Sequence, residues 1–150
     1  MILEIKNVLL ILAPIVSISI LGKFFPANNQ PYKPIFQPPN WIFPIIWTYI
    51  TVSLGIITNH VQNLVEHKAP IYIIYSIQLI LLNTWLIINY YKKYKLAFWI
   101  LVLSAYTAVT YCIYISKISN TVYYLIPMPF WLILASCLNG VIYDRTNQTL

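Results

Sequence analysis

The chain has 150 residues, of which 60% are hydrophobic and 8% are charged, and its mean hydropathy is +0.73. This composition excludes a water-soluble fold of this size, because too few polar side chains are present to cover its surface. Nine Lys and Arg against three acids give a formal charge of +6, but they stand in short gaps between apolar runs, which argues against nucleic acid as a partner.

Five apolar runs, charged only near their ends, are each long enough to cross a bilayer, which takes about 20 residues of helix. They cover residues 5–24, 41–65, 71–91, 96–116 and 121–143. Runs of this length exclude a β-barrel, whose strands need only about 10 residues with strict alternation. The sequence therefore predicts an all-α membrane protein, with one domain over residues 1–150 folded as a bundle of five transmembrane helices.

The segment between the first two runs, residues 25–40, contains five prolines and is predicted not to be helical. A stiff loop of this length at a membrane face has two interpretations. It is either a lid over a cavity between helices or a connector between distant helix ends. Its composition alone does not choose between them.

The basic residues are divided unequally between the two sides of the membrane. Five crossings place Lys6, Lys68 and Lys117 on the side of the N-terminus. The other six Lys and Arg lie on the opposite side, which holds residues 25–40, 92–95 and 144–150. The positive-inside rule therefore predicts an N-terminus outside and a C-terminus in the cytoplasm.

Ionisable side chains are absent from the middle of every predicted span. Proton relays, voltage sensors and most ion-coupled carriers need such a group, so these functions are not favoured. His60 and His67 are interpreted as interfacial, and Cys112 and Cys137 have no partner at metal-ligand spacing. The sequence predicts no metal, no cofactor and no catalytic nucleophile with its base.

Aromatic and amide side chains are the remaining chemistry inside the spans. Trp131, Ala135, Leu138 and Asn139 follow i, i+4, i+7, i+8 spacing, so they share one helix face. This face suits either a flat apolar ligand or ordinary helix packing. Asn83 must find a partner at membrane depth, and a hydrogen bond between helices is the simpler interpretation.

Small residues in the first span predict close helix contact. Ala13 and Ser17 form a small-xxx-small pair, which allows two helix backbones to approach. This pair is one indication of a homodimer.

The order of several motifs resembles the family of tryptophan-rich sensory proteins and translocator proteins, also called the peripheral benzodiazepine receptor family. The run from Lys33 to Trp47, KPIFQPPNWIFPIIW, is similar to the signature K-P-x-aromatic-x-P-P-x-W-x-F-x-x-x-W of that family. Further similar blocks follow in family order across nearly the whole chain. They are Leu12-Ala13-Pro14, Leu82-Asn83 before Tyr90-Tyr91, and Pro127 to Trp131 before Leu138-Asn139.

The resemblance implies a five-helix bundle, often dimeric, with a cavity that binds porphyrins, benzodiazepine-type drugs and, in animal members, cholesterol. The residues that it places in this cavity are Trp47, Asn83, Phe98, Trp131, Ala135 and Leu138. A loose cholesterol-recognition pattern runs from Leu138 through Tyr143 to Arg145.

Three functional hypotheses follow from this resemblance. The first is a membrane protein that binds a tetrapyrrole, or another flat apolar ligand, for transport, sensing or regulation. Its partners are then that ligand and membrane lipid. The second is light-dependent porphyrin breakdown through Trp47 and Trp131, and the third is a membrane scaffold.

Overall fold

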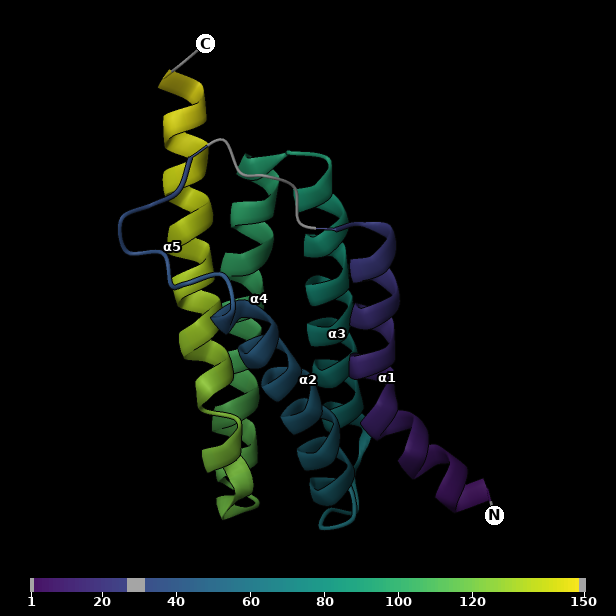
Figure 1. Ribbon diagram of the computed structural model, residues 1–150. Helices are drawn as coiled ribbons and strands as arrows, with labels where there is room; N and C mark the ends of the chain where they lie inside the picture. The colour runs from purple at the N-terminus through teal and green to yellow at the C-terminus, as the bar shows by residue number, and fades with distance from the viewer. Residues whose placement is uncertain (1, 27–31, 149–150) are drawn as a thin grey trace.

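The computed structural model describes residues 2–26 and 32–148, which form five long α-helices and one short 3-10 helix (Figure 1). The helices are α1 (Ile2–Phe24), α2 (Ile42–Val61), α3 (Ala69–Tyr90), α4 (Tyr94–Ser116), η1 (Asn120–Tyr124) and α5 (Pro127–Gln148). The described ranges contain no strand. The predicted all-α bundle of five helices is confirmed. The start of α1 and the end of α5 lie at opposite ends of the bundle, as an odd number of crossings requires.

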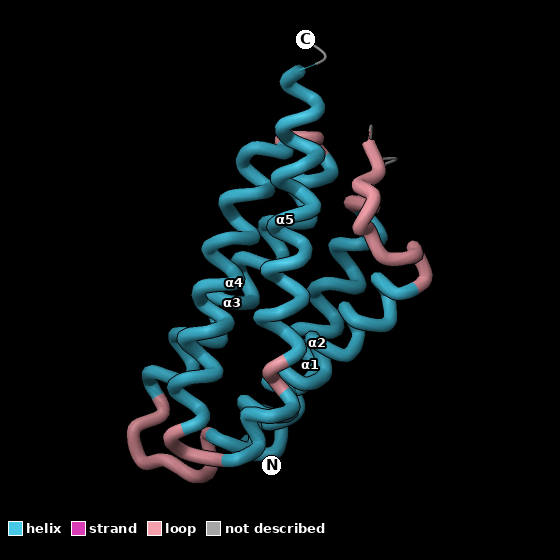
Figure 2. The backbone as a smooth tube through the Cα atoms, turned by 90° about the vertical axis from the view of Figure 1, so that its left-hand side faces the viewer, coloured by secondary structure: helices cyan, strands magenta, loops and turns pink. Residues whose placement is uncertain are grey.

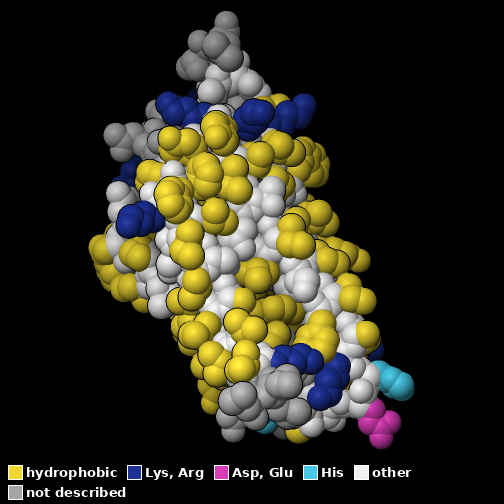
Figure 3. All heavy atoms as spheres, turned by 90° about the vertical axis from the view of Figure 1, so that its right-hand side faces the viewer, with side chains coloured by type: hydrophobic (Ala, Val, Ile, Leu, Met, Phe, Trp, Pro, Cys, Tyr) yellow, Lys and Arg dark blue, Asp and Glu magenta, His cyan; other side chains and the backbone are white. Residues whose placement is uncertain are grey.

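The outer surface of the bundle is apolar. All five long helices have the length and hydropathy of membrane spans. Val8 on α1, Ile80 on α3 and Tyr106 on α4 are exposed. On the face in Figure 3, hydrophobic side chains cover the middle, and Lys and Arg lie mainly toward the two ends. Lipid chains are the environment in which such a surface is stable, so this is a multi-pass membrane protein. Which end faces the cytoplasm stays a prediction.

Two of the helix ends that differ from the predicted spans have a local explanation. Helix α2 ends at Val61 rather than near residue 65. Shortly after Val61 the hydrogen bonds span three residues instead of four, and the Asn63 N–H donates to the His60 carbonyl at 3.2 Å. Helix α5 begins at Pro127 rather than near residue 121. Prolines 127 and 129 lack an N–H and fit only the first turn of a helix, so the preceding residues form η1 instead.

Helix α1 contains Pro14 in its interior, and Figure 1 shows that this helix is bent. Proline has no N–H, so the carbonyl of Leu10, four residues earlier, loses its donor within the helix. The hydroxyl of Tyr75 on α3 donates a hydrogen bond to this carbonyl oxygen at 2.7 Å. The neighbouring helix thus compensates the backbone bond that proline removes.

Helices α1 and α2 come very close beside this bend. A Cβ atom on Gly55 of α2 would lie 2.5 Å from the carbonyl oxygen of Ile11 and 2.9 Å from its Cα. Both are backbone atoms and cannot rotate away as the end of a flexible side chain does. The absence of a side chain at Gly55 therefore sets the distance between the two helices.

Replacing Gly55 with alanine is expected to destabilise the protein by about 1–3 kcal/mol, the usual cost of overpacking a tight contact. The measurement is the midpoint of thermal unfolding in detergent. Gly22→Ala on α1 is the matched control. A Cβ there would meet no atom within 4 Å, and alanine favours the helix, so its midpoint should stay or rise. Equal midpoints for the two variants would contradict the close approach.

Buried or partly buried polar pairs also join the helices. Each should stabilise the bundle by about 0.6 kcal/mol, with an upper value near 2 kcal/mol. The pairs are Thr58 Oγ1 with Tyr111 Oη at 2.7 Å, Gln78 Nε2 with Ser104 Oγ at 2.8 Å, and Asn83 Nδ2 with Ser17 Oγ at 3.1 Å. The last pair shows that Ser17, which the sequence indicated for close helix contact, faces α3 of the same chain.

Neighbouring helices around the bundle follow the order α2, α1, α3, α4, α5. Helices α5 and α2, at the two ends of this order, make only a slight contact with each other. Figure 2 shows α1 and α2 leaning away from α4 and α5 toward the end where the proline-rich segment lies. Helix α2 begins only near the middle of the bundle in Figure 1. Residues 32–40, rather than a helix, therefore occupy the space above its start.

Candidate functional site

A cavity of about 760 Å³, here called the aromatic cavity, lies between α1, α2, α3, α5 and the proline-rich segment. Ligand sites in proteins commonly measure about 300–1,000 Å³. Its walls are Ile18, Gly22 and Phe25 from the first helix and its end, Lys33, Gln37 and Asn40 from the segment, Phe43, Pro44 and Trp47 from α2, Leu82, Trp85, Leu86 and Asn89 from α3, and Trp131, Ala135, Leu138 and Asn139 from α5.

Aromatic rings from three helices meet at this cavity. The rings of Trp47 on α2 and Trp85 on α3 are stacked, with centroids 5.2 Å apart and an angle of 19° between their planes. On the other side, Phe43 meets Trp131 edge to face at 5.2 Å. Flat aromatic surfaces of this kind favour flat, apolar ligands.

The same walls contain polar atoms without a partner. Seven buried side-chain N or O atoms find no hydrogen-bond partner within residues 2–26 and 32–148, and five of them belong to residues that line the aromatic cavity. They are the indole nitrogens of Trp85 and Trp131 and the amide oxygens of Gln37, Asn89 and Asn139. Leaving such an atom unpaired costs about 1–3 kcal/mol. Each of these atoms has almost no accessible surface, so a ligand or water reaches the two donors and three acceptors when their side chains turn toward the cavity.

The proline-rich segment is held against α5. The guanidinium carbon of Arg145 lies 5.5 Å from the centre of the Tyr32 ring, and the neighbouring Pro34 is buried. Such cation–π contacts contribute about 0.5–1 kcal/mol at exposed sites. Figure 1 shows the segment crossing α5 on its way to α2. The segment forms a wall of the cavity, which favours the lid interpretation over a bare connector; that it opens and closes stays a prediction.

Four of the six residues that the resemblance proposed for the cavity lie in its walls: Trp47, Trp131, Ala135 and Leu138. All four residues of the predicted α5 face, which includes Asn139, are there. That they bind a ligand stays a prediction.

Asn83 and Phe98 do not line the cavity, so the structure does not bring them together with the other four residues. That they bind a ligand stays a prediction. Asn83 points between helices, where its amide donates to Ser17 and to the carbonyl of Leu79 at 2.9 Å. Phe98 belongs to α4, which contributes no residue to the walls. Its ring lies against α5, 3.2 Å from where a Cβ on Gly140 would stand.

Sequence reasoning missed the α3 wall of the cavity. Leu82, Trp85, Leu86 and Asn89 are spaced i, i+3, i+4, i+7 and share one helix face. This spacing is the same signal that identified the α5 face. The neighbouring Asn83 lies about 100° around the helix from Leu82, so it faces α1 instead.

No group of three or more His, Cys, Asp or Glu that would suit a metal ion exists in the part of the chain that the structure describes. The loose cholesterol pattern is also not gathered at one place. Leu138 faces the aromatic cavity, Arg145 contacts Tyr32, and Tyr143 lines a different pocket on the other side of α5.

Comparison with known proteins gives a family for this arrangement. The model of the TspO/MBR family matches residues 9–144, which include all of α2, α3 and α4, most of α1 and α5, and the residues of α2, α3 and α5 that line the cavity. The chain belongs to the TspO/MBR family. It is similar to the tryptophan-rich protein TspO of Archaeoglobus fulgidus, with 31% identity over 148 residues that cover 91% of this chain and 97% of that protein.

Membership of the TspO/MBR family makes this chain a membrane protein of the ligand-binding or sensing type, which takes small apolar ligands. The resemblance found in the motifs is thereby confirmed. The aromatic cavity, with stacked rings and unpaired polar groups, is the place in the described structure that suits this role.

Proposed function

We propose that the aromatic cavity binds a flat, largely apolar molecule with polar groups at its edge, a tetrapyrrole such as protoporphyrin being the leading case, which the protein passes on or senses. One observation carries this proposal. Three tryptophans line a single cavity of about 760 Å³, and five residues of its walls carry a buried polar atom without a partner. A purely apolar molecule would leave the polar atoms unsatisfied, and a small polar one would not cover the rings.

The rings and the amides have different tasks in this proposal. Trp47, Trp85 and Trp131 supply apolar surface, and each aromatic contact contributes about 0.5–1.5 kcal/mol beyond the area that it buries. The indole N–H groups of Trp85 and Trp131 donate to acceptors on the ligand, and the amide oxygens of Asn89 and Asn139 accept from its donors. A porphyrin offers the oxygens of its edge carboxyl groups to the indoles. Its ring N–H groups point into the centre of the macrocycle, so a bridging water or a protonated carboxyl group supplies the donor for the amides.

Lys33 supplies the cation for a ligand carboxylate, since it is the one cationic residue in the described walls of the cavity. It is exposed and lies on the proline-rich segment. An exposed ion pair contributes about 0.2–1 kcal/mol, so this residue adjusts affinity and orientation rather than providing most of the binding.

The experiment is a titration of the purified protein in detergent with protoporphyrin IX, followed by tryptophan fluorescence. Saturable quenching is expected. Lys33→Gln should weaken binding of this dicarboxylate about two- to fivefold, the equivalent of one exposed ion pair. It should leave binding of the uncharged dimethyl ester unchanged.

Lys23→Gln is the matched control, because it removes one lysine on the same side of the membrane outside the cavity walls. Non-saturable quenching would contradict the proposal, and together with a stable dimer or hetero-complex it would favour the scaffold hypothesis. Light-dependent breakdown of the porphyrin stays a prediction; Trp47 and Trp131 both lie where a bound ring would contact them.

A further inference from the structure

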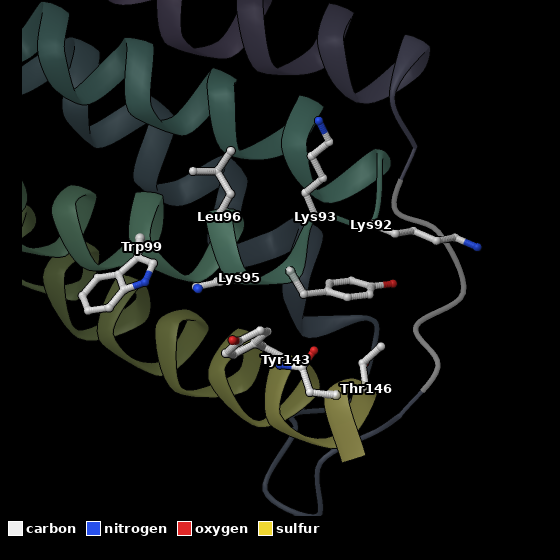
Figure 4. Close-up of a pocket in the computed structure, with 9 residues that line it drawn as sticks. Lys92, Lys93, Lys95, Leu96, Trp99, Tyr143 and Thr146 are labelled. Carbon is white, nitrogen blue, oxygen red and sulfur yellow. The ribbon is translucent and has the colours of Figure 1, made fainter. Parts of the chain in front are cut away.

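A second pocket, of about 570 Å³, lies at the turn between α3 and α4 and against the end of α5 (Figure 4). It shares no lining residue with the aromatic cavity. Figure 4 shows Lys92 and Lys93 at the turn, Lys95 and Trp99 on α4, and Tyr143 and Thr146 on α5. The proposed ligand role of the aromatic cavity uses none of these residues.

Positive charge dominates this second pocket. Three lysines, Lys92, Lys93 and Lys95, stand within four residues of one another, and all three are exposed. No acidic side chain is among the described residues that line it. Asp144 is next to Tyr143 in α5 but is exposed and outside the lining, and Glu66 precedes α3 at its other end. Such a pocket suits an anion.

The backbone places one of these cations at a position that glycine normally occupies. Lys92 has φ of 57°, and it is the only non-glycine residue in the described ranges with a positive φ. The N–H of Lys92 donates to the Asn89 carbonyl at 3.0 Å, and that of Lys93 to the Ile88 carbonyl at 3.3 Å. This is a Schellman motif, in which the left-handed residue is usually glycine. The left-handed conformation costs more free energy for lysine than for glycine. The presence of lysine at this position therefore points to a role for its charged ammonium group.

The pocket opens onto a surface that faces lipid. Trp99 is 57% exposed, and Leu103 and Tyr106, one and two turns further along α4, are 51% and 71% exposed. Trp99 and Tyr143 are residue types that favour the depth of lipid headgroups. The lysines lie on the side that the positive-inside rule assigns to the cytoplasm, where anionic lipids are concentrated.

We propose that this pocket binds the phosphate of an anionic phospholipid. Figure 4 shows the amines of Lys92, Lys93 and Lys95 pointing in different directions, so these exposed side chains turn toward the headgroup when the lipid binds. The acyl chains run along Trp99, Leu103 and Tyr106 of α4. The adjoining apolar stripe distinguishes this occupant from a soluble phosphate, which would gain nothing from it.

Native mass spectrometry of the full chain in detergent tests the proposal, with phosphatidylglycerol as the probe. The triple variant K92Q/K93Q/K95Q is expected to bind it about 10- to 100-fold more weakly, given the attraction of each lysine to an anionic headgroup. The control variant K6Q/K68Q/K117Q makes the same change in charge at the other end of the bundle and should bind as the parent does. Equal weakening in both variants would overturn the proposal, and so would displacement of the lipid by inorganic phosphate.

Lys92→Gly separates binding from folding. Glycine relieves the left-handed backbone, so the midpoint of thermal unfolding should rise while retention of phosphatidylglycerol falls severalfold. A higher unfolding midpoint with undiminished binding of phosphatidylglycerol would show that Lys92 does not contribute to lipid binding. Binding of protoporphyrin IX should be unchanged in all these variants, so failure of this proposal is distinguishable from failure of the proposed function.

Discussion

Replacement of Trp131 by alanine is expected to weaken protoporphyrin IX binding by about 30-fold or more, the loss of roughly 2 kcal/mol that is typical when a central aromatic contact is removed. Trp131 is 7% exposed, contacts Phe43 and provides one of the two unpaired indole N–H groups. Its loss removes both a flat surface and a donor. The measurement is the dissociation constant from fluorescence titration in detergent.

Two further variants make this prediction decisive. Trp131→Ala also removes buried volume and should lower stability by about 3–5 kcal/mol, so Trp131→Phe is tested beside it to keep a ring in a folded protein. Phenylalanine keeps most of the surface but not the N–H, so its loss of affinity should be smaller and still measurable. Trp99→Ala, which removes an exposed indole outside the cavity, should bind as the parent does. Similar affinities in the Trp131→Ala, Trp131→Phe and parent proteins would exclude Trp131 from the site.

Replacement of Asn139 by leucine is expected to have opposite effects on stability and on binding. The Asn139 amide is buried, and its oxygen finds no partner among the described residues. Its N–H donates only to the Ala135 carbonyl one turn earlier, at 3.0 Å. Leucine removes a buried unpaired oxygen, so the unliganded protein should become more stable by about 1–3 kcal/mol. Affinity for protoporphyrin IX should fall, because an acceptor is lost from the wall.

Asn83→Leu is the matched control for this prediction. Like Asn139, Asn83 has a buried amide oxygen without a partner among the described residues, but it lies outside the cavity, and its amide donates to Ser17 on α1. Its replacement should leave affinity for protoporphyrin IX unchanged while removing a hydrogen bond between helices. The two asparagines therefore separate a role in binding from a role in packing. A destabilised Asn139→Leu protein with undiminished affinity would show that Asn139 is a packing residue.

The sequence predicted the architecture because the signal is simple. A run of about 20 apolar residues has few alternatives to a membrane-spanning helix, since every backbone polar group must be satisfied internally in lipid. The helix ends depend on local backbone features that hydropathy does not show. Pro127 and Pro129 shifted the start of α5, and the tightened backbone after Val61 shortened α2.

The candidate site was only partly predictable. The α5 wall followed from helical spacing, and the α3 wall had the same signal around Trp85 and Asn89. Phe98 could not be assigned from spacing, because its position depends on which helices surround the cavity. Helix α4 packs behind α3 and α5, so it is absent from the walls. The distance set by Gly55 and the bond from Tyr75 to Leu10 are tertiary features with no counterpart in a sequence pattern.

The most direct test of the central claim is fluorine NMR of protein labelled with 5-fluorotryptophan. The chain has five tryptophans: Trp47, Trp85 and Trp131 line the aromatic cavity, and Trp41 and Trp99 are exposed outside it. Each resonance is assigned by replacing one tryptophan with phenylalanine. On addition of protoporphyrin IX, the resonances of Trp47, Trp85 and Trp131 should shift together and saturably, with those of Trp41 and Trp99 much less affected. Shifts confined to Trp41 and Trp99, or equal at all five positions, would contradict binding in the cavity.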